Sequence, residues 1–208
     1  MKKLLKITGL TLLVLLLLAF TIPIVFKKQV QTLVKMEINK QLNAKVDFSD
    51  VRLSLFRHFP KVTISLKEFK ITGKSSFSKD TLVSAENIEL TAGLFSVLKG
   101  KDIKVHGLYL KSPRIHLLVD KLGKNNWDIA RSSSDTSGLT DTSASRFKIS
   151  LKDYSISDGY LRYEDKMANT YTELKGLNHS GSGDLTADLF TLSTSTRATS
   201  ATLIVDDI

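Results

Sequence analysis

Twenty consecutive residues near the N-terminus, from Ile7 to Phe26, carry no charge. As an α-helix this stretch would be about 30 Å long, which is enough to cross the hydrocarbon layer of a bilayer. Lysines stand on both sides of it, and Lys27 and Lys28 close it. The sequence therefore predicts a membrane anchor over residues 1–28, with Ile7 and Phe26 at the apolar limits and Lys27 and Lys28 at the membrane surface.

A cleaved secretory signal is the competing interpretation, because it also combines a positive start with an apolar middle. No small-x-small cleavage site follows the apolar run, so a retained anchor is favoured. The short N-terminal tail carries three lysines and is expected to stay in the cytoplasm. A single-pass protein with the bulk of its chain translocated is therefore predicted.

The formal net charge of +9 does not predict a nucleic-acid partner. Five of the 30 lysines and arginines lie in the first 28 residues, where there is no acidic residue, which leaves 25 basic against 21 acidic residues. That balance is typical of an ordinary protein surface. The lysines around the anchor suit anionic lipid headgroups instead. The chain has no cysteine, which excludes disulfides and thiolate chemistry.

Residues 29–45 have apolar positions at helical spacing, through Val30, Val34 and Ile38, with polar residues between them. This pattern predicts an amphipathic helix. The helix could lie at the membrane surface or pack on the first strands, and the sequence does not decide between these two positions.

From Val46 onward the apolar period changes to two, which indicates strands with one apolar face. The first strand region covers residues 46–130, and alternation resumes over 147–208, where it reaches the end without a closing helix and suggests a fragment of a longer chain. Between them, residues 131–146 are rich in Ser, Thr and Asp and predict a flexible loop. A short helix or a turn is expected between Gly93 and Gly100. Turns are expected at Phe59-Pro60, Gly73 to Ser76, Gly100 to Asp102, Ser112-Pro113 and Asp158-Gly159.

An apolar sheet face left in water costs about 25 cal/mol per Å², so something must cover it. No long amphipathic helix follows Ala44. The cover could be a second layer of the same sheet, acyl chains held in a trough, or a protein partner. The candidate lining residues are Val51, Leu53, Leu55, Val62, Ile64, Leu66, Ile88, Leu90, Ile103, Val105, Ile115, Leu117 and Val119.

Two segments in this order resemble the N-terminal part of the AsmA family of envelope proteins. The first is residues 103–129, IKVHGLYLKSPRIHLLVDKLGKNNWDI, and the second is residues 149–165, ISLKDYSISDGYLRYED. Lys124 and Asn125 depart from the family's usual residues before the Asn-Trp pair, and family members are usually much longer. The matching positions are Gly107, Pro113, Gly123, Asn126 and Trp127, then Asp158, Gly159, Tyr163 and Asp165.

The resemblance implies a mainly β fold, with an N-terminal transmembrane helix, a curved antiparallel sheet called a repeating β-groove, and few short helices. It implies an inner-membrane anchor with the sheet in the periplasm, and a role in outer-membrane assembly and lipid movement. The expected partners are membrane phospholipids and outer-membrane assembly proteins. An alternative is an interaction module that recruits a partner by strand addition, without binding lipid.

Neither a catalytic nor a metal site is predicted, and no cofactor is expected. The four histidines, His58, His106, His116 and His179, have no recognised metal spacing. Gly123, Asn126 and Trp127 are expected to form a structural turn that closes the first β unit, with Trp127 as a recognition aromatic being the alternative. An envelope hydrolase has no supporting residue constellation, so a non-enzymatic protein is expected.

Overall fold

The computed structural model describes residues 3, 6–11, 13–14, 21, 25, 27–99, 103–129, 147–183 and 191–205. Over this part the fold is mainly β, as the sequence predicts. Its helical elements include α2 (Lys27–Gln41), the 3-10 turn η1 (Ser75–Phe77) and α3 (Leu94–Lys99). Its strands are β1 (Lys45–Asp47), β2 (Asp50–His58), β3 (Lys61–Thr72), β4 (Thr81–Gly93), β5 (Ile103–Lys111), β6 (Arg114–Val119), β7 (Phe147–Asp165), β8 (Thr170–Ser182), β9 (Ser193–Arg197) and β10 (Ser200–Val205).

Most of the predicted anchor, including Phe26, lies outside the described residues, as do the predicted loop 131–146 and the turn at Gly100 to Asp102. Ile7 is helical and 65% exposed. Lys27 and Lys28 are the first two residues of α2. Within the described ranges, no helix has both the length and the hydropathy needed to cross a membrane. The anchor therefore stays a prediction.

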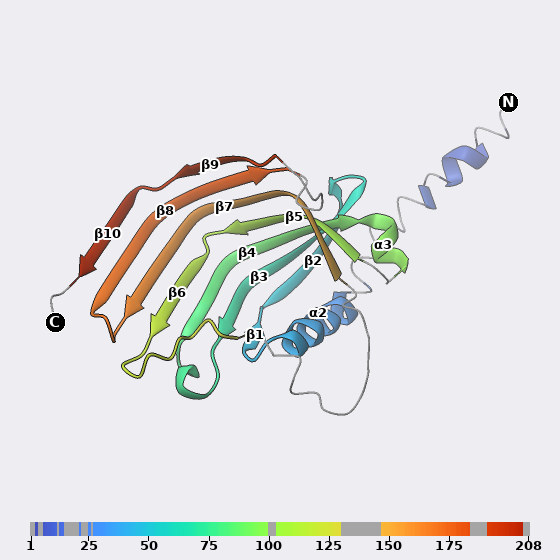
Figure 1. Ribbon diagram of the computed structural model, residues 1–208. Coiled ribbons are helices and arrows are strands. Elements are labelled where there is room, and N and C mark those ends of the chain that lie inside the picture. Colours follow the sequence, from blue (N-terminus) through green and yellow to red (C-terminus); the bar gives the residue numbers. More distant parts are fainter. Residues whose placement is uncertain are drawn as a thin grey trace.

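All ten described strands form one sheet, in the order β1-β3-β4-β5-β7-β8-β10. The other three strands pair with members of this order: β2 pairs with β3, β6 pairs with β4 and β7, and β9 pairs with β8. Figure 1 shows the strands side by side and bent along their length, with α2 at the β1 end. The described strands thus build a single curved layer, and the two-layer interpretation of the sequence is wrong for this part of the chain.

The prediction of a wholly antiparallel sheet is wrong at one position. β7 runs parallel to both β5 and β6, with Ile103 opposite Phe147 and Arg114 opposite Tyr160. Parallel neighbours need a crossover connection of a dozen or more residues, whereas antiparallel neighbours need only a short turn. The chain between Val119 and Phe147 supplies that length. The sheet is therefore mixed.

A line of irregular residues crosses the sheet at one level, and we call it the crease. Its members have a positive φ: Glu68 in β3 (50°), Ser112 between β5 and β6 (47°), Asp158 in β7 (50°) and Gly176 in β8 (59°). The break between β9 and β10 lies at the same level, since Arg197 pairs with Asn178 and Ser200 with Lys175. Extra residues of this kind bend a strand and increase its twist. The crease accounts for the bend in Figure 1.

Two predicted turns belong to this crease, so these predictions are wrong. Ser112-Pro113 does not reverse the chain, because β5 and β6 both pair with β4 and with β7 in the same direction. Asp158-Gly159 lies inside the 19-residue strand β7. By contrast, the turn at Phe59-Pro60, the loop after Gly73 and the helix α3 form where the sequence predicts them.

Asp158 is the centre of the hydrogen bonding in the crease. Its carboxylate accepts from the Ser112 hydroxyl at 3.0 Å and from Arg114 at 3.3 Å. Its backbone carbonyl accepts from Arg114 at 2.8 Å, and its backbone N–H donates to the Asn178 side chain at 3.2 Å. Aspartate tolerates the left-handed conformation and bonds local backbone well. Three strand positions are therefore tied together where their ladders are interrupted.

The hydrophobic core lies between α2 and the first four strands. Val34 of α2 is 7% exposed and packs with Val51, Leu66 and Ile88 of the sheet. Polar contacts fix the helix: Lys35 bonds Asp47 at 2.6 Å, Lys27 bonds Asp50 at 2.6 Å, and Asn39 accepts from the Val46 N–H at 3.1 Å. The amphipathic segment 29–45 therefore packs on the first strands, which is one of the two positions that the sequence left open.

Candidate functional site

The apolar face of the sheet is continuous across seven strand positions. Residues paired across a ladder lie on the same face, as do residues two apart along a strand. One row runs from Val51 through Leu66, Ile88 and Leu110 to Ile156. Beyond the crease another row joins Ile71, Val83, Ile115, Leu161 and Leu174.

The crease keeps both rows on one side. Along each strand, successive residues of the apolar face are two positions apart in the sequence. At the crease they are three positions apart, as from Leu66 to Phe69 and from Ile156 to Gly159. Without this extra residue, all side chains beyond the crease would change faces. Because neighbouring strands carry the extra residue at the same level, the pairing of Lys67 with Asn87 and of Phe69 with Ala85 stays in register. The bend therefore preserves one apolar surface along the whole strand.

Burial divides this face into two parts. Under α2 the side chains are excluded from solvent, with Val51 at 0%, Leu66 at 2% and Phe69 at 7% exposure. On β7 and β8 the same face is only half-buried, at Ile156, Leu161 and Leu174. At β10 it is exposed, with Leu203 at 68% and Val205 at 62%. We call these the covered part (β1–β4) and the uncovered part (β5–β10) of the apolar face.

The predicted lining residues are distributed over both parts. Five are buried in the structure: Val51, Val62, Ile64, Leu66 and Ile88. Half-buried are Leu53, Leu55, Leu90, Val105, Ile115, Leu117 and Val119. The side chain of Ile103 lies outside the described residues. Val51, Ile64, Leu66 and Ile88 belong to the same buried cluster as Val34 of α2, so a ligand could reach these four only if the helix were displaced.

The list of predicted lining residues omits the apolar side chains of β7 and β8, which the structure brings onto the same face. Ile156 and Leu161 lie in β7, and Leu174 and Leu177 lie in β8. The alternation of the sequence predicts β7 as a strand, but only the pairing of β5 and β6 with β7 shows that its apolar side continues theirs. The uncovered part is built largely by these residues.

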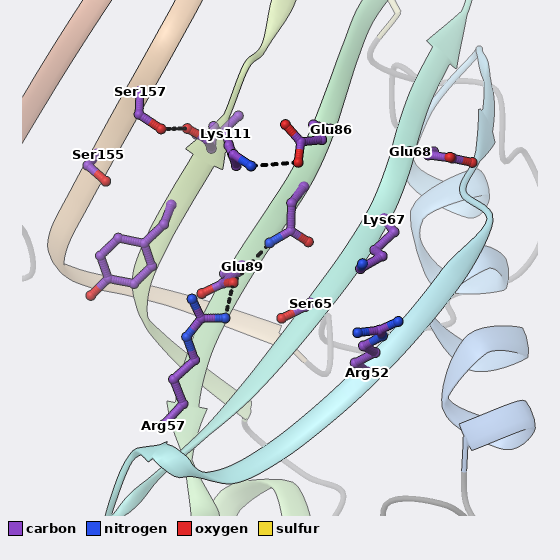
Figure 2. A pocket seen from close by; sticks show the side chains of 13 residues that line it. Arg52, Arg57, Ser65, Lys67, Glu68, Glu86, Glu89, Lys111, Ser155 and Ser157 are labelled. Atoms are coloured by element: carbon purple, nitrogen blue, oxygen red, sulfur yellow. Dashed lines mark hydrogen bonds and ion pairs between the residues drawn. The ribbon is translucent and has the colours of Figure 1, made fainter.

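The opposite face is polar and hollowed beside the crease. Figure 2 shows this hollow, which has a volume of about 630 Å³ and is lined by β2, β3, β4, β5 and β7. Arg57 pairs with Glu89, whose side chain is 10% exposed, and Lys111 pairs with Glu86 at 2.6 Å. The Asn87 amide donates to Glu89 at 2.9 Å. Two of the three carboxylates in the hollow are thus neutralised by cations, an arrangement that stabilises a sheet surface.

One stacked aromatic pair joins β2 and β5. The His58 and Tyr109 rings stack with centroids 5.6 Å apart, and the His58 ring contacts the Thr63 hydroxyl at 3.0 Å. A Cβ at Gly107 would stand 2.9 Å from the Tyr109 hydroxyl, so the close approach of Tyr109 requires glycine there. Burial, followed by the charges of Asp153 and Glu89, raises the pKa of Tyr109. The neutral phenol is therefore the stable form, which suits packing.

The predicted structural turn is held mainly by Asn126. Its side chain is buried, accepts from the Leu118 N–H at 2.9 Å and donates to the His116 carbonyl at 2.8 Å. Gly123 has φ +75°, a conformation that favours glycine. The Trp127 ring is 39% exposed and lies 6.2 Å from the Tyr163 ring. These three residues lie together at the end of β6, and their structural role stays a prediction.

The described residues contain no candidate metal site, because no group of three or more His, Asp or Glu side chains among them could hold an ion.

The geometry defines a class: a single-layer curved sheet with a continuous apolar face, one end of which is covered by a helix. The AsmA family model matches residues 1–188, and the chain belongs to the AsmA family. Comparison with curated proteins and with solved structures gives no match.

Proposed function

We propose that this chain is a non-enzymatic, inner-membrane-anchored periplasmic protein that supports outer-membrane assembly and lipid homeostasis. In this proposal, phospholipid acyl chains lie on the uncovered part of the apolar face. Membership of the AsmA family is consistent with an envelope role of this kind. The observation that carries the proposal is the division of one apolar face into a part under α2 and a part without a second layer among the described residues.

The physical reason is the cost of leaving that surface in water. Each Å² of exposed apolar area costs about 25 cal/mol, so acyl chains placed on Ile156, Leu161 and Leu174 would remove a cost from both partners. A phospholipid headgroup could remain solvated at the rim of the sheet. Holding or passing lipid in this way needs no covalent step.

A photo-crosslinking experiment on the full chain tests this proposal. A benzophenone amino acid replaces Ile156 on the apolar face, and a matched variant carries it at Ser155, the preceding residue of β7, on the polar face. After irradiation in the membrane, adducts are identified by mass spectrometry. Phospholipid adducts that form many-fold more often at Ile156 than at Ser155 support lipid binding. Equal yields at the two positions, or no lipid adduct at Ile156, would contradict it.

A second candidate is a scaffold that recruits an outer-membrane assembly protein by strand addition. The observation favouring it is β10, which pairs with β8 along one edge and has no partner along the other edge among the described strands. Its side chains are exposed, and such an edge can accept another strand. A benzophenone amino acid at Ile204 would then give protein adducts and no lipid adducts.

A further inference from the structure

One end of the sheet carries two large aromatic side chains in solvent. Phe59 lies in the turn between β2 and β3, and Phe95 lies in α3, and each is 76% exposed. The two segments are neighbours because Lys61, just after the turn, pairs with Gly93, just before α3. We call this the aromatic end of the sheet. Exposed apolar side chains gathered at one end of a molecule mark an interaction surface more often than single scattered ones do.

The charges at the aromatic end have one sign. The described residues there are 55–62, 92–99, 103–106 and 147–151, and they contain no Asp or Glu. Their basic residues are Lys61, Lys99, Lys104 and Lys148, together with Arg57, whose charge is paired with Glu89. At the opposite end, which we call the loop end, residues 73–80, 120–129 and 165–170 combine five lysines with four aspartates. Only the aromatic end therefore complements a negatively charged surface over the described chain.

Helix α2 points toward the aromatic end. Its last residues lead into β1, where Lys45 pairs with Thr72 at the loop end of β3. Its first residue, Lys27, bonds Asp50, which pairs with Lys67, five residues nearer the aromatic end of β3. The helix axis from Gln41 to Lys27 thus runs toward Phe59 and Phe95. The uncharged run that the sequence predicts as the anchor directly precedes Lys27.

We propose that the aromatic end docks on a bilayer surface containing anionic phospholipid, with Phe59 and Phe95 in the interfacial layer and the surrounding lysines against the headgroups. Apolar rings gain from leaving water at this depth, and each nearby lysine adds electrostatic attraction. The proposal rests on the membrane anchor of the proposed function. It also gives the uncovered part of the apolar face a starting point at the bilayer, because the half-buried Val105 of β5, which pairs with Ala92, lies at this end.

The absence of cysteine permits a clean labelling experiment. Phe59→Cys and Phe95→Cys variants of the full chain carry an environment-sensitive nitrobenzoxadiazole dye. Leu122→Cys at the loop end is the matched control, because Leu122 is also apolar and 79% exposed. The proteins are reconstituted into phosphatidylcholine vesicles containing phosphatidylglycerol, with or without a headgroup-level nitroxide lipid. We expect the nitroxide to quench the dye at Phe59 and Phe95 and to leave the dye at Leu122 unchanged.

A charge variant tests the role of the lysines. The double variant Lys61→Gln, Lys104→Gln carries the dye at Phe95→Cys. In vesicles with phosphatidylglycerol, each substitution should lower the ratio of docked to undocked protein about five-fold, which corresponds to about 1 kcal/mol per lysine. In phosphatidylcholine alone the two substitutions should make no difference.

Each of the following outcomes overturns the proposal. Equal quenching at Phe95 and Leu122 means that the aromatic end has no special position. A blue-shifted dye that the nitroxide does not quench means that protein, and not lipid, covers this end. A full chain that an alkaline wash removes from the vesicles contradicts the anchor itself, whereas retention without quenching contradicts only the docking. The Ile156 crosslink reports separately on lipid binding by the face.

Discussion

The covered and uncovered parts of the apolar face have similar side chains but different surroundings. In the covered part, Val34 of α2 completes a cluster in which Val51 and Leu66 have almost no contact with water. In the uncovered part, Ile156 stands in the same row as Val51 and Leu66, and Leu174 stands in the row beyond the crease; both are half-buried. An alternating sequence therefore creates the face, but the position of a single helix decides which part of it becomes a folding core.

This difference separates stability from the proposed activity. A cluster sealed by the chain's own helix contributes to folding and is not available to a ligand. A surface that the described chain leaves half-open contributes less to folding and can accept apolar molecules from outside. Substitutions in the two parts should therefore have different consequences.

The largest expected effect is the truncation of a side chain in the covered part. Leu66→Ala should lower the free energy of unfolding by about 2–4 kcal/mol, because Leu66 is buried and the cavity would lie under α2. The matched change Leu174→Ala in the uncovered part should cost less than about 1 kcal/mol, since water already reaches this side chain. Urea unfolding of the full chain in mild detergent, followed by circular dichroism, measures both. Similar losses for the two variants would remove the distinction between the parts.

A second prediction concerns the backbone of the uncovered part at the crease. Gly176 has φ +59°, and a Cβ there would stand 2.2 Å from the Thr199 hydroxyl. Gly176→Ala should therefore cost at least about 1–2 kcal/mol, through left-handed strain and the clash. Ser180→Ala, at an exposed position of the same strand, is the control and should change little. An unchanged unfolding midpoint for Gly176→Ala would show that the crease is not fixed at this strand.

The sequence predicts the strands well because alternation is a local property. It also predicts the turn at Phe59-Pro60 and the helix α3, where glycine and proline interrupt the pattern. It fails at Ser112-Pro113 and Asp158-Gly159 because turns and bulges use the same backbone chemistry. Whether such a pair reverses the chain or only bends it depends on the neighbouring strands, and this information is not local. The parallel position of β7 is missed for the same reason.

The candidate site shows a similar limit. The alternation identifies Ile115 and Leu117 as members of an apolar face, and the structure places them on it. It cannot tell that Val51 and Leu66 are under a helix, because the apolar stripe of residues 29–45 would fit a membrane surface equally well. Whether the helix covers these residues depends on contacts such as Lys27 with Asp50 and Asn39 with Val46. These contacts join α2 to the first strands and are visible only in the three-dimensional structure.

A third prediction tests how firmly α2 covers its part. The Asn39 side chain accepts from the Val46 N–H and donates to the Lys35 carbonyl at 2.8 Å. Asn39→Ala should lower the free energy of unfolding by about 1 kcal/mol, since both backbone groups lose a partner. Lys40→Ala, at an exposed position of the same helix, should have a smaller effect. If Asn39→Ala behaved like Lys40→Ala, apolar packing alone would hold the helix.

The smallest expected effect is a pH dependence that arises on the polar side of the uncovered part. Hydrogen bonds from Lys175 and then from the Tyr160 hydroxyl lower the pKa of Glu173 from 4.5 to about 2. A depressed carboxyl pKa stabilises the folded state above pH 4.5, and this contribution is lost as the pH falls toward 2. The contribution is modest because solvent screens pairs near the surface. Unfolding midpoints at pH 7 and pH 3 should therefore differ less in Glu173→Gln than in the unsubstituted chain.

The substitution Lys35→Gln is the comparison for this pH effect in the covered part. Its partner Asp47 also has a lowered pKa, caused first by the Lys35 hydrogen bond, so this carboxyl too loses stabilising interactions in acid. If the acid sensitivity disappears in Lys35→Gln and persists in Glu173→Gln, the helix contact and not the β7–β8 pair controls the response. That result would place the pH-sensitive contact in the covered part, where acid would loosen the helix from the face that it covers.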